Sequence, residues 1–416
     1  YEYYNAVVVP DLSAQMEGEA RSLILFCGLR VGSISYEYSD DVPSGCVIRQ
    51  YPEAGSSVAP FSSVRLVVSD SLDGVVYVDS ECVATLHNGR SWNTAYATIQ
   101  EGIDAARAHS DSEIWVRSGT YTSNGAPVVR MKEGVHIYGG FSGDEQSRDI
   151  RNWTQNRTVL DGQHLDRCVI GATGCTLDGF VVTRGYASAS TLPGFGGGML
   201  NLGAAPKIYN CVFVENVATV GGGIAGVGLS DATIANCVFV GNRASYGGGV
   251  SCTNSFPLIV NCTLSKNVAE GSSGIGGGVW SDSDSFPTIM NCILWGNTAT
   301  GEGSQLWSEG LVDYVNYSCV EDLPDIGGFG NISNDPLFEH PDSDYRLGCS
   351  SPCIDAAALL PEFFWDISGV HRPIGSGYDM GAYEYVPDPF TPPTGSVNIN
   401  HGAASTNVPE VTLSLA

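Results

Sequence analysis

The sequence of 416 residues predicts a mainly β protein in which a parallel β-helix follows a small α+β domain and precedes a strand-rich tail. Three observations lead to this prediction: a repeat of about 25 residues, four runs of triple glycine, and a total of 52 glycines without a collagen period. A hydrophobic content of 43% is too high for a disordered chain. We expect domain boundaries that divide the chain into residues 1–72, 73–386 and 387–416.

Composition excludes several classes of function. The chain carries 19 basic and 45 acidic residues, a net charge of −26, which repels nucleic-acid phosphates and anionic lipid. We therefore expect no nucleic-acid binding. No apolar run approaches the roughly 18 residues that cross a bilayer, so we also expect no membrane insertion. The 13 cysteines include no C-x-x-C pair and the seven histidines are scattered, so we predict no haem, zinc or other cofactor.

Residues 7–70 predict the α+β domain. A short strand at 7–9 precedes a helix, for which Ser13 is the expected cap and Gly28 the expected end. Three strands should follow at 31–38, 47–51 and 64–68, separated by turns rich in proline and glycine.

The same segment, from VPDL at 9–12 to VRLVVS at 64–69, resembles a PASTA domain over nearly its whole length. The resemblance implies a location outside the cell and a role as a spacer or in binding cell-wall fragments, and it brings no catalytic motif. Cys27 and Cys46 are candidates for a disulfide between the helix end and a strand, and two buried thiols are the equally good alternative.

The repeat determines the expected β-helix. Asn-Cys pairs begin at 210, 236, 261 and 291, and the positions around them match from copy to copy. Each copy reads as three short strands, with further asparagines at 216, 242, 267 and 297 at the bends and triple glycine at the corners. We predict that three ladders form the core: Ile208, Ile234, Ile259 and Ile289; Cys211, Cys237, Cys262 and Cys292; and Phe213, Phe239, Leu264 and Leu294. We predict that the stacked cysteines pack as small apolar side chains in the core and do not form disulfides or bind metal.

Flanking motifs extend the prediction over residues 73–385. An amphipathic helix at about 96–108 is placed to close the open end of the solenoid. The YGGFSG segment at 138–143, DPLF at 335–338, SPCIDA at 351–356 and DMGAYEY at 379–385 resemble bacterial right-handed parallel β-helix surface proteins with polymorphic-outer-membrane-protein-like repeats. That resemblance implies a pectin-lyase-like solenoid and no single biochemical activity.

No catalytic residue is predicted. A polysaccharide lyase or hydrolase on this fold needs carboxylates in matching positions of adjacent coils, but the expected outward positions after triple glycine hold Leu200, Ala225, Ser251 and Trp280. We predict that Asp282 and Asp284 are solvated carboxylates in turns. Ca²⁺ binding is possible on this fold, but no pattern in the sequence supports it.

The strands also predict an apolar outward stripe, formed by residues that alternate with the core ladders. Either a loop or the carboxyl-terminal tail covers this stripe, or it is an interface with another molecule. The tail, SVNINHGAASTNVPEVTLSLA, resembles the opening strands of a bacterial immunoglobulin-like domain and is either truncated or completed by another molecule. The candidate interface residues are Val212, Val214, Val238, Val240, Ile293 and Trp295 in the stripe and Val411, Leu413 and Leu415 in the tail.

Together these features predict an extracellular or cell-surface structural or adhesive protein whose partners are copies of itself, assembled into a fibre or surface layer. The first alternative is an adhesin that binds cell-surface glycans, with Trp280, Trp295 and Trp307 as candidates for stacking on sugar rings. The second alternative is a polysaccharide-degrading enzyme.

Overall fold

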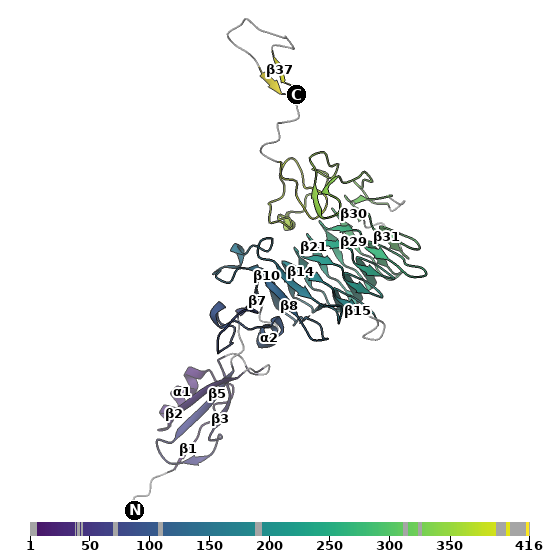
Figure 1. Ribbon diagram of the computed structural model, residues 1–416. Coiled ribbons are helices and arrows are strands. Elements are labelled where there is room, and N and C mark those ends of the chain that lie inside the picture. Colours follow the sequence, from purple (N-terminus) through teal and green to yellow (C-terminus); the bar gives the residue numbers. More distant parts are fainter. Residues whose placement is uncertain are drawn as a thin grey trace, which may run out of the picture.

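The structure is a computed structural model that describes residues 6–37, 39, 42, 45–69, 74–106, 111–187, 194–310, 315–322, 327–387, 397–399 and 413–415. Figure 1 shows a small amino-terminal domain, a stack of parallel β coils and the carboxyl-terminal segments that follow the stack. Among the described residues, no helix is both long enough and apolar enough to cross a membrane.

The amino-terminal domain packs one helix on a mixed sheet. Its elements are β1 (Val7–Val8), α1 (Glu17–Phe26), β2 (Arg30–Glu37), β3 (Val47–Tyr51), β4 (Ser57–Val58) and β5 (Ser63–Ser69), with the sheet order β2-β5-β3. The expectation that Ser13 caps the helix is wrong, because α1 begins at Glu17 after an uncapped Met16 and the amide of Ser13 instead donates to Asp11. The helix ends before Gly28, whose φ of +74° suits glycine.

The two cysteines of this domain are free thiols, so the disulfide considered between them is absent. Cys46 pairs across a β-bridge with Met16, at the amino end of α1, whereas Cys27 caps the carboxyl end. The ten residues of α1 separate these two ends by about 15 Å, well beyond the roughly 7 Å that a disulfide spans between Cα atoms.

The solenoid has about nine turns, and in its described residues parallel strands stack into three long sheets and a short one. The first sheet contains β6 (Val75–Val78), β7 (Ser112–Arg117), β10 (Val135–Phe141), β13 (Thr176–Asp178), β17 (Lys207–Tyr209), β21 (Thr233–Ala235), β25 (Leu258–Val260), β29 (Thr288–Met290) and β33 (Val315–Asn316). The second sheet contains β8 (Gly119–Thr122), β11 (Thr158–Asp161), β14 (Phe180–Thr183), β18 (Val212–Val214), β22 (Val238–Val240), β26 (Thr263–Ser265), β30 (Ile293–Trp295) and β34 (Cys319–Val320).

The third sheet and the short sheet have fewer strands than the first two and complete the later coils. The third sheet contains β9 (Val129–Arg130), β12 (Val169–Ile170), β16 (Met199–Leu202), β20 (Ile224–Ser230), β24 (Val250–Ser255), β28 (Val279–Ser281) and β32 (Leu306–Ser308). The short sheet contains β15 (Tyr186–Ala187), β19 (Val217–Ala218), β23 (Arg243–Ala244), β27 (Val268–Ala269) and β31 (Thr298–Ala299).

The core of the solenoid is built from the three ladders. Ile208, Ile234, Ile259 and Ile289 pair in register in the first sheet, and Phe213, Phe239, Leu264 and Leu294 do so in the second. These side chains and those of Cys211, Cys237, Cys262 and Cys292 are at most 1% exposed. The cysteines are free, and burial raises the pKa of the Cys237 and Cys292 thiols, which keeps them protonated.

Two rows of asparagine turn the chain between sheets. Asn210, Asn236, Asn261 and Asn291 have φ between 50° and 56°, a left-handed conformation that asparagine tolerates, at the corner between the first and second sheets. Asn216, Asn242, Asn267 and Asn297 form a buried ladder in which each Nδ2 donates to the next Oδ1 at 2.9 Å. The ladder continues from Asn297 through Gln305 to the carboxylate of Glu321.

Triple glycine is needed for two distinct reasons. The first glycine of a run, such as Gly221 at φ +68°, takes a left-handed conformation, whereas a Cβ on Gly222 or Gly223 would come within 2.5 Å of a carbonyl oxygen in the next coil. The residues that follow each run, Leu200, Ala225, Ser251 and Trp280, alternate with core residues as expected, but they are at most 8% exposed, so these outward positions do not reach solvent.

A short helix closes the amino end of the solenoid. It is α2 (Ile99–Ala105), preceded by the short helix η1 (Trp92–Thr94), and it is shorter than the 96–108 expected, of which 107 and 108 lie outside the described residues. Thr98 and Glu101 form a capping box, and Ile99 and Ile103 are buried in the same core as the strands. The helix therefore shields the first coil from water.

The carboxyl-terminal cover, residues 338–385, contains β35 (Phe338–His340), β36 (Asp344–Leu347) and η3 (Pro361–Phe363). It packs Phe338, Tyr345, Leu347, Cys353, Ile367, Met380 and Ala382 onto the outer face of the second sheet. Val238 and Ile293 are thereby 2% and 1% exposed, and Val212, Val240 and Trp295 pack against the same cluster. The stripe expected as a candidate interface is thus covered from within the chain, and Val214 beside it is half-buried.

Polar contacts fasten the cover. Arg372 and Glu384, both with fully buried side chains, form an ion pair at 2.9 Å, and Arg372 also donates to the carbonyls of Asp379 and Gly381. The Gly381 amide donates to the carbonyl of Asn291 in the solenoid, and the Ala382 amide donates to Thr263.

The tail contains β37 (Val397–Ile399) and β38 (Leu413–Leu415), which pair antiparallel. Val411 and the side chains of Leu413 and Leu415 lie outside the described residues.

Candidate functional site

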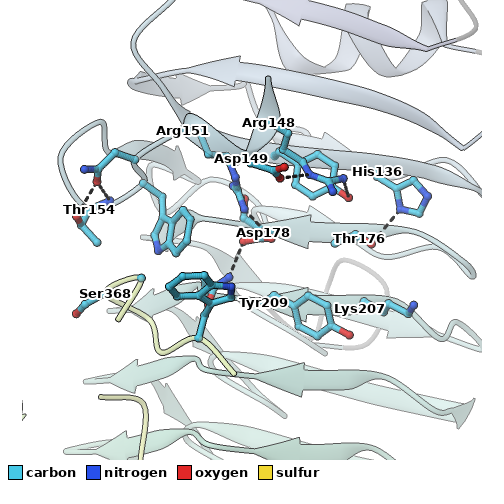
Figure 2. A pocket seen from close by; sticks show the side chains of 16 residues that line it. His136, Arg148, Asp149, Arg151, Thr154, Thr176, Asp178, Lys207, Tyr209 and Ser368 are labelled. Carbon is cyan, nitrogen blue, oxygen red and sulfur yellow. Dashed lines mark hydrogen bonds and ion pairs between the residues drawn. The ribbon is translucent and has the colours of Figure 1, made fainter. Parts of the chain in front are cut away.

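The main candidate site is a cleft of about 910 Å³ on the outer face of the first sheet (Figure 2). Strands β10, β13 and β17 form its floor. In register, His136, Thr176 and Lys207 make one row of side chains. A second row, two residues further along each strand, consists of Tyr138, Asp178 and Tyr209. The alternating residues between these rows point inward and are fully buried, so core packing fixes the outward direction of both rows.

One wall is an insertion, residues 142–157, between β10 and β11. The equivalent connection in a later coil, between β17 and β18, consists only of Asn210 and Cys211. The insertion carries the short helix η2 (Arg148–Ile150) and then Arg151, whose guanidinium lies 5.2 Å from the Tyr138 ring and 4.7 Å from the Trp153 ring. Arg151 therefore holds Trp153 against the floor.

The opposite wall comes from the cover through Trp365, Ser368 and Gly369. The indole Nε1 of Trp153 donates to the carbonyl of Ile367 at 2.7 Å, which ties the two walls together across 214 residues of sequence. The carbonyl of Trp365 accepts from Nδ2 of Asn236 at 2.8 Å, which anchors the cover to the corner of the solenoid. The cleft is therefore complete only when the cover is docked.

Charge in the cleft is partly neutralised. Asp178 accepts from Arg151 at 2.7 Å and from Nδ2 of Asn210 at 2.9 Å. Arg148 pairs with Glu113, and it also donates to the hydroxyl of Tyr138 at 3.1 Å. Lys207 is exposed and has no ion-pair partner among the residues that the structure describes.

Other side chains supply hydrogen-bonding groups. His136 lies 2.9 Å from the Thr176 hydroxyl through Nδ1 and 3.5 Å from Asp111 through Nε2. Burial raises the pKa of both Tyr138 and Tyr209, so their hydroxyls stay protonated near neutral pH and serve as donors. Aromatic rings, hydroxyls, an amide and cations thus converge on one cavity, as in sites for polar ligands with several hydrogen-bonding groups.

A second cavity of about 370 Å³ adjoins the first. Trp153, Thr154, Asn210 and Ser368 line both cavities. The second cavity extends past Phe180 and Val212 of the second sheet and is bordered by Arg157, Asp344 and Arg346. Together the two cavities form a groove that crosses the corner between the first and second sheets.

None of the described residues forms a group of three or more histidine, cysteine, aspartate or glutamate side chains that could hold a metal ion. Asp282, one of the turn carboxylates, instead accepts hydrogen bonds from the amides of Asn254 and Asp284.

The tryptophans considered for sugar stacking lie elsewhere. Trp280 is buried beside Tyr246, and Trp295 packs against the cover. Trp307 pairs in register with Trp280 in the third sheet.

The sequence did not predict the cleft, because the acidic and basic residues considered as candidates for catalysis lie after residue 185, whereas most of the residues that line the cleft precede residue 185. The feature of the sequence that could have indicated the cleft is the insertion at 142–157, which contains the sequence Arg-Asn-Trp at 151–153.

Comparisons with known proteins bear on the two parts of the chain separately. Residues 7–70 match the PASTA domain family. A stretch of 61 residues is 43% identical to a probable serine/threonine-protein kinase of Clostridium acetobutylicum, and this stretch covers 15% of this chain and 9% of the kinase. The chain thus shares only a small part of that relative's length.

Two solved structures resemble the chain at low similarity. Pectate lyase Pel9A is 14% identical with a TM-score of 0.33, over 76% of this chain and 97% of the lyase. The pectin methylesterase of Aspergillus niger is 16% identical with a TM-score of 0.32, over 67% of this chain and 91% of the esterase. Scores this low carry no information about activity. The protein consists of a PASTA domain at residues 7–70 followed by a parallel β-solenoid.

Proposed function

We propose that this is a cell-surface or wall-associated protein whose solenoid binds a glycan in the cleft on its first sheet. The observation that carries the proposal is the convergence of Tyr138, Trp153, Tyr209 and Trp365 with hydroxyl, amide and cationic groups in one cavity of about 910 Å³. Sugars present both apolar ring faces and many hydroxyls, so a site for them combines aromatic rings with hydrogen-bonding groups. The PASTA domain supports the location at the cell surface or wall.

The proposed activity is binding without cleavage. Glycosidic bond hydrolysis uses two carboxyl groups that flank the bond. Asp178 is held by Arg151 and Asn210, and the side chain of Asp149 is 87% exposed, which supports a binding role for the cleft. The assay is incubation of the full chain with each bound glycan followed by chromatography of the products, and release of shorter fragments would contradict this part of the proposal.

Self-assembly through the apolar stripe is not proposed, because the cover occupies that face.

Binding is tested with the full chain on a glycan array, followed by titration of intrinsic tryptophan fluorescence with the glycans that bind. We expect saturable binding that Tyr209→Ala weakens by at least about tenfold. The matched control is Tyr186→Ala, which removes an exposed tyrosine from β15, outside both cavities. Absence of binding to every glycan on the array by the folded protein, or equal weakening by both variants, would contradict the proposal.

A further inference from the structure

The two cavities together indicate a more specific ligand, an inference that rests on the proposed glycan-binding function. Because they share Trp153, Thr154, Asn210 and Ser368, a ligand can pass from one to the other without leaving the surface. A pocket of roughly 300–1,000 Å³ encloses a ligand of several rings, so the larger cavity alone holds more than one sugar. A linear oligosaccharide therefore fits this groove better than a single sugar does.

The groove is basic on an acidic protein. Five basic side chains line it, Arg148, Arg151, Arg157, Lys207 and Arg346, against three acidic ones, Asp149, Asp178 and Asp344. The chain as a whole carries 19 basic and 45 acidic residues, so the balance in the groove is reversed. An anionic ligand is repelled by most of this molecule and is attracted here.

Two of these cations have no ionic partner among the residues that the structure describes. Within the described part of the chain, Arg151 pairs with Asp178, Arg346 with Asp344 and Arg148 with Glu113, whereas neither Lys207 nor Arg157 has a carboxylate within 4.0 Å. Lys207 lines the larger cavity and Arg157 the smaller one. Each cavity thus offers one uncompensated positive charge.

Trp153 borders both cavities and therefore lies where they meet, whereas Lys207 lines only the larger cavity and Arg157 only the smaller one. Its indole is held in place by the hydrogen bond to Ile367 and by the guanidinium of Arg151. The resulting order along the groove is a cation, an aromatic ring and a second cation.

We propose that the groove binds a linear acidic oligosaccharide, with anionic groups of the ligand at Lys207 and Arg157 and a sugar ring beside Trp153. Carboxylates of uronic acids and sulfate esters share the chemistry that these two cations recognise. The ligand spans both cavities, so affinity depends on both its charge and its length.

The test uses the full chain and four defined sugars in fluorescence titrations at low salt. The probes are β-1,4-linked mannohexaose, the hexasaccharide and disaccharide of β-1,4-linked mannuronate, and a sulfated hexasaccharide from heparin. Mannohexaose and hexamannuronate differ only in the carboxylates, so their comparison isolates charge. We expect at least one acidic hexasaccharide to bind about tenfold or more tightly than mannohexaose, and the disaccharide to bind about tenfold more weakly than hexamannuronate. Preference for hexamannuronate assigns carboxylates to the two cations, and preference for the heparin fragment assigns sulfates.

Variants locate the contacts. Lys207→Gln and Arg157→Gln should each weaken acidic hexasaccharide binding about tenfold and reduce its salt dependence, whereas Arg243→Gln, which alters an exposed cation outside both cavities, should not. Equal affinity for mannohexaose and the acidic sugars, or for the disaccharide and the hexasaccharide, would overturn this inference and leave the proposed function standing. Absence of binding to all four probes also overturns it, and the glycan array then decides the proposed function by itself.

Discussion

The ion pair between Arg372 and Glu384 should control how firmly the cover is docked. Arg372→Met removes the charge while keeping an unbranched side chain of similar length. It leaves the Glu384 carboxylate buried without its cation and leaves the carbonyls of Asp379 and Gly381 without a donor. Breaking a buried pair in this way costs about 3–5 kcal/mol. Glu384 still accepts from the amides of Ile374 and Asp379, so we expect the lower end, about 3 kcal/mol.

The assay is hydrogen exchange of the amides of Gly381 and Ala382, which donate from the cover to the solenoid. A loss of about 3 kcal/mol should accelerate their exchange roughly 150-fold, since 1.36 kcal/mol corresponds to a factor of ten. The amide of Val238, which donates to Cys211 within the solenoid, reports whether the solenoid itself has opened.

Arg346→Met is the matched control within the cover. Arg346 pairs with Asp344 near the surface, so its loss should cost less than about 1 kcal/mol and accelerate exchange less than about fivefold. Equal exchange of Gly381 and Ala382 in the wild-type protein and in Arg372→Met would refute the view that this ion pair fastens the cover.

Two further predictions concern the asparagine ladder and pH. Asn267→Leu should lower the free energy of unfolding by at least about 3 kcal/mol in urea denaturation, because the side-chain amide of Asn267 makes four hydrogen bonds whose partners would stay buried. The control Asn124→Leu alters an exposed residue and should change the free energy of unfolding by less than about 0.5 kcal/mol. Similar losses in both variants would contradict the role of the ladder. Burial raises the pKa of Asp379 from 3.8 to about 6, so the folded state binds the proton more tightly and this stabilisation is lost as pH rises through 6. Protection of the Gly381 amide, corrected for intrinsic exchange, should therefore fall roughly tenfold between pH 5 and pH 7 and should depend less on pH in Asp379→Asn; equal pH dependence in both proteins would contradict this assignment.

The carboxyl-terminal motifs at 351–356 and 379–385 have a structural role in this chain. In the structure they form the cover: Phe338 and Cys353 are buried, Asp379 accepts from the amide of Asp355, and Glu384 pairs with Arg372. The sequence alone identified these motifs but not the face that they cover. The outward stripe was recognised from alternation, and its occupant became evident only when residues 338–385 were placed against it.

The cleft was harder to anticipate. Its floor residues occur at 136 and 138, at 176 and 178, and at 207 and 209, so the spacing between coils is 40 and then 31 residues. Insertions such as 142–157 lengthen these early coils and hide the repeat that is plain after residue 196. A search by constant period therefore passes over the coils that carry the site.

The amino-acid sequence by itself determined the solenoid, the register of its ladders and the PASTA domain. In a solenoid each coil contacts mainly its neighbours, so a repeat in sequence becomes a repeat in space and side-chain alternation separates core from surface. Only the tertiary structure decided that the apolar stripe is an internal contact and that Trp153 and Trp365 face one cleft. Trp153 and the cover are more than 200 residues apart in the sequence, and the repeat does not relate them. Burial of the stripe beneath the returning chain brings them together.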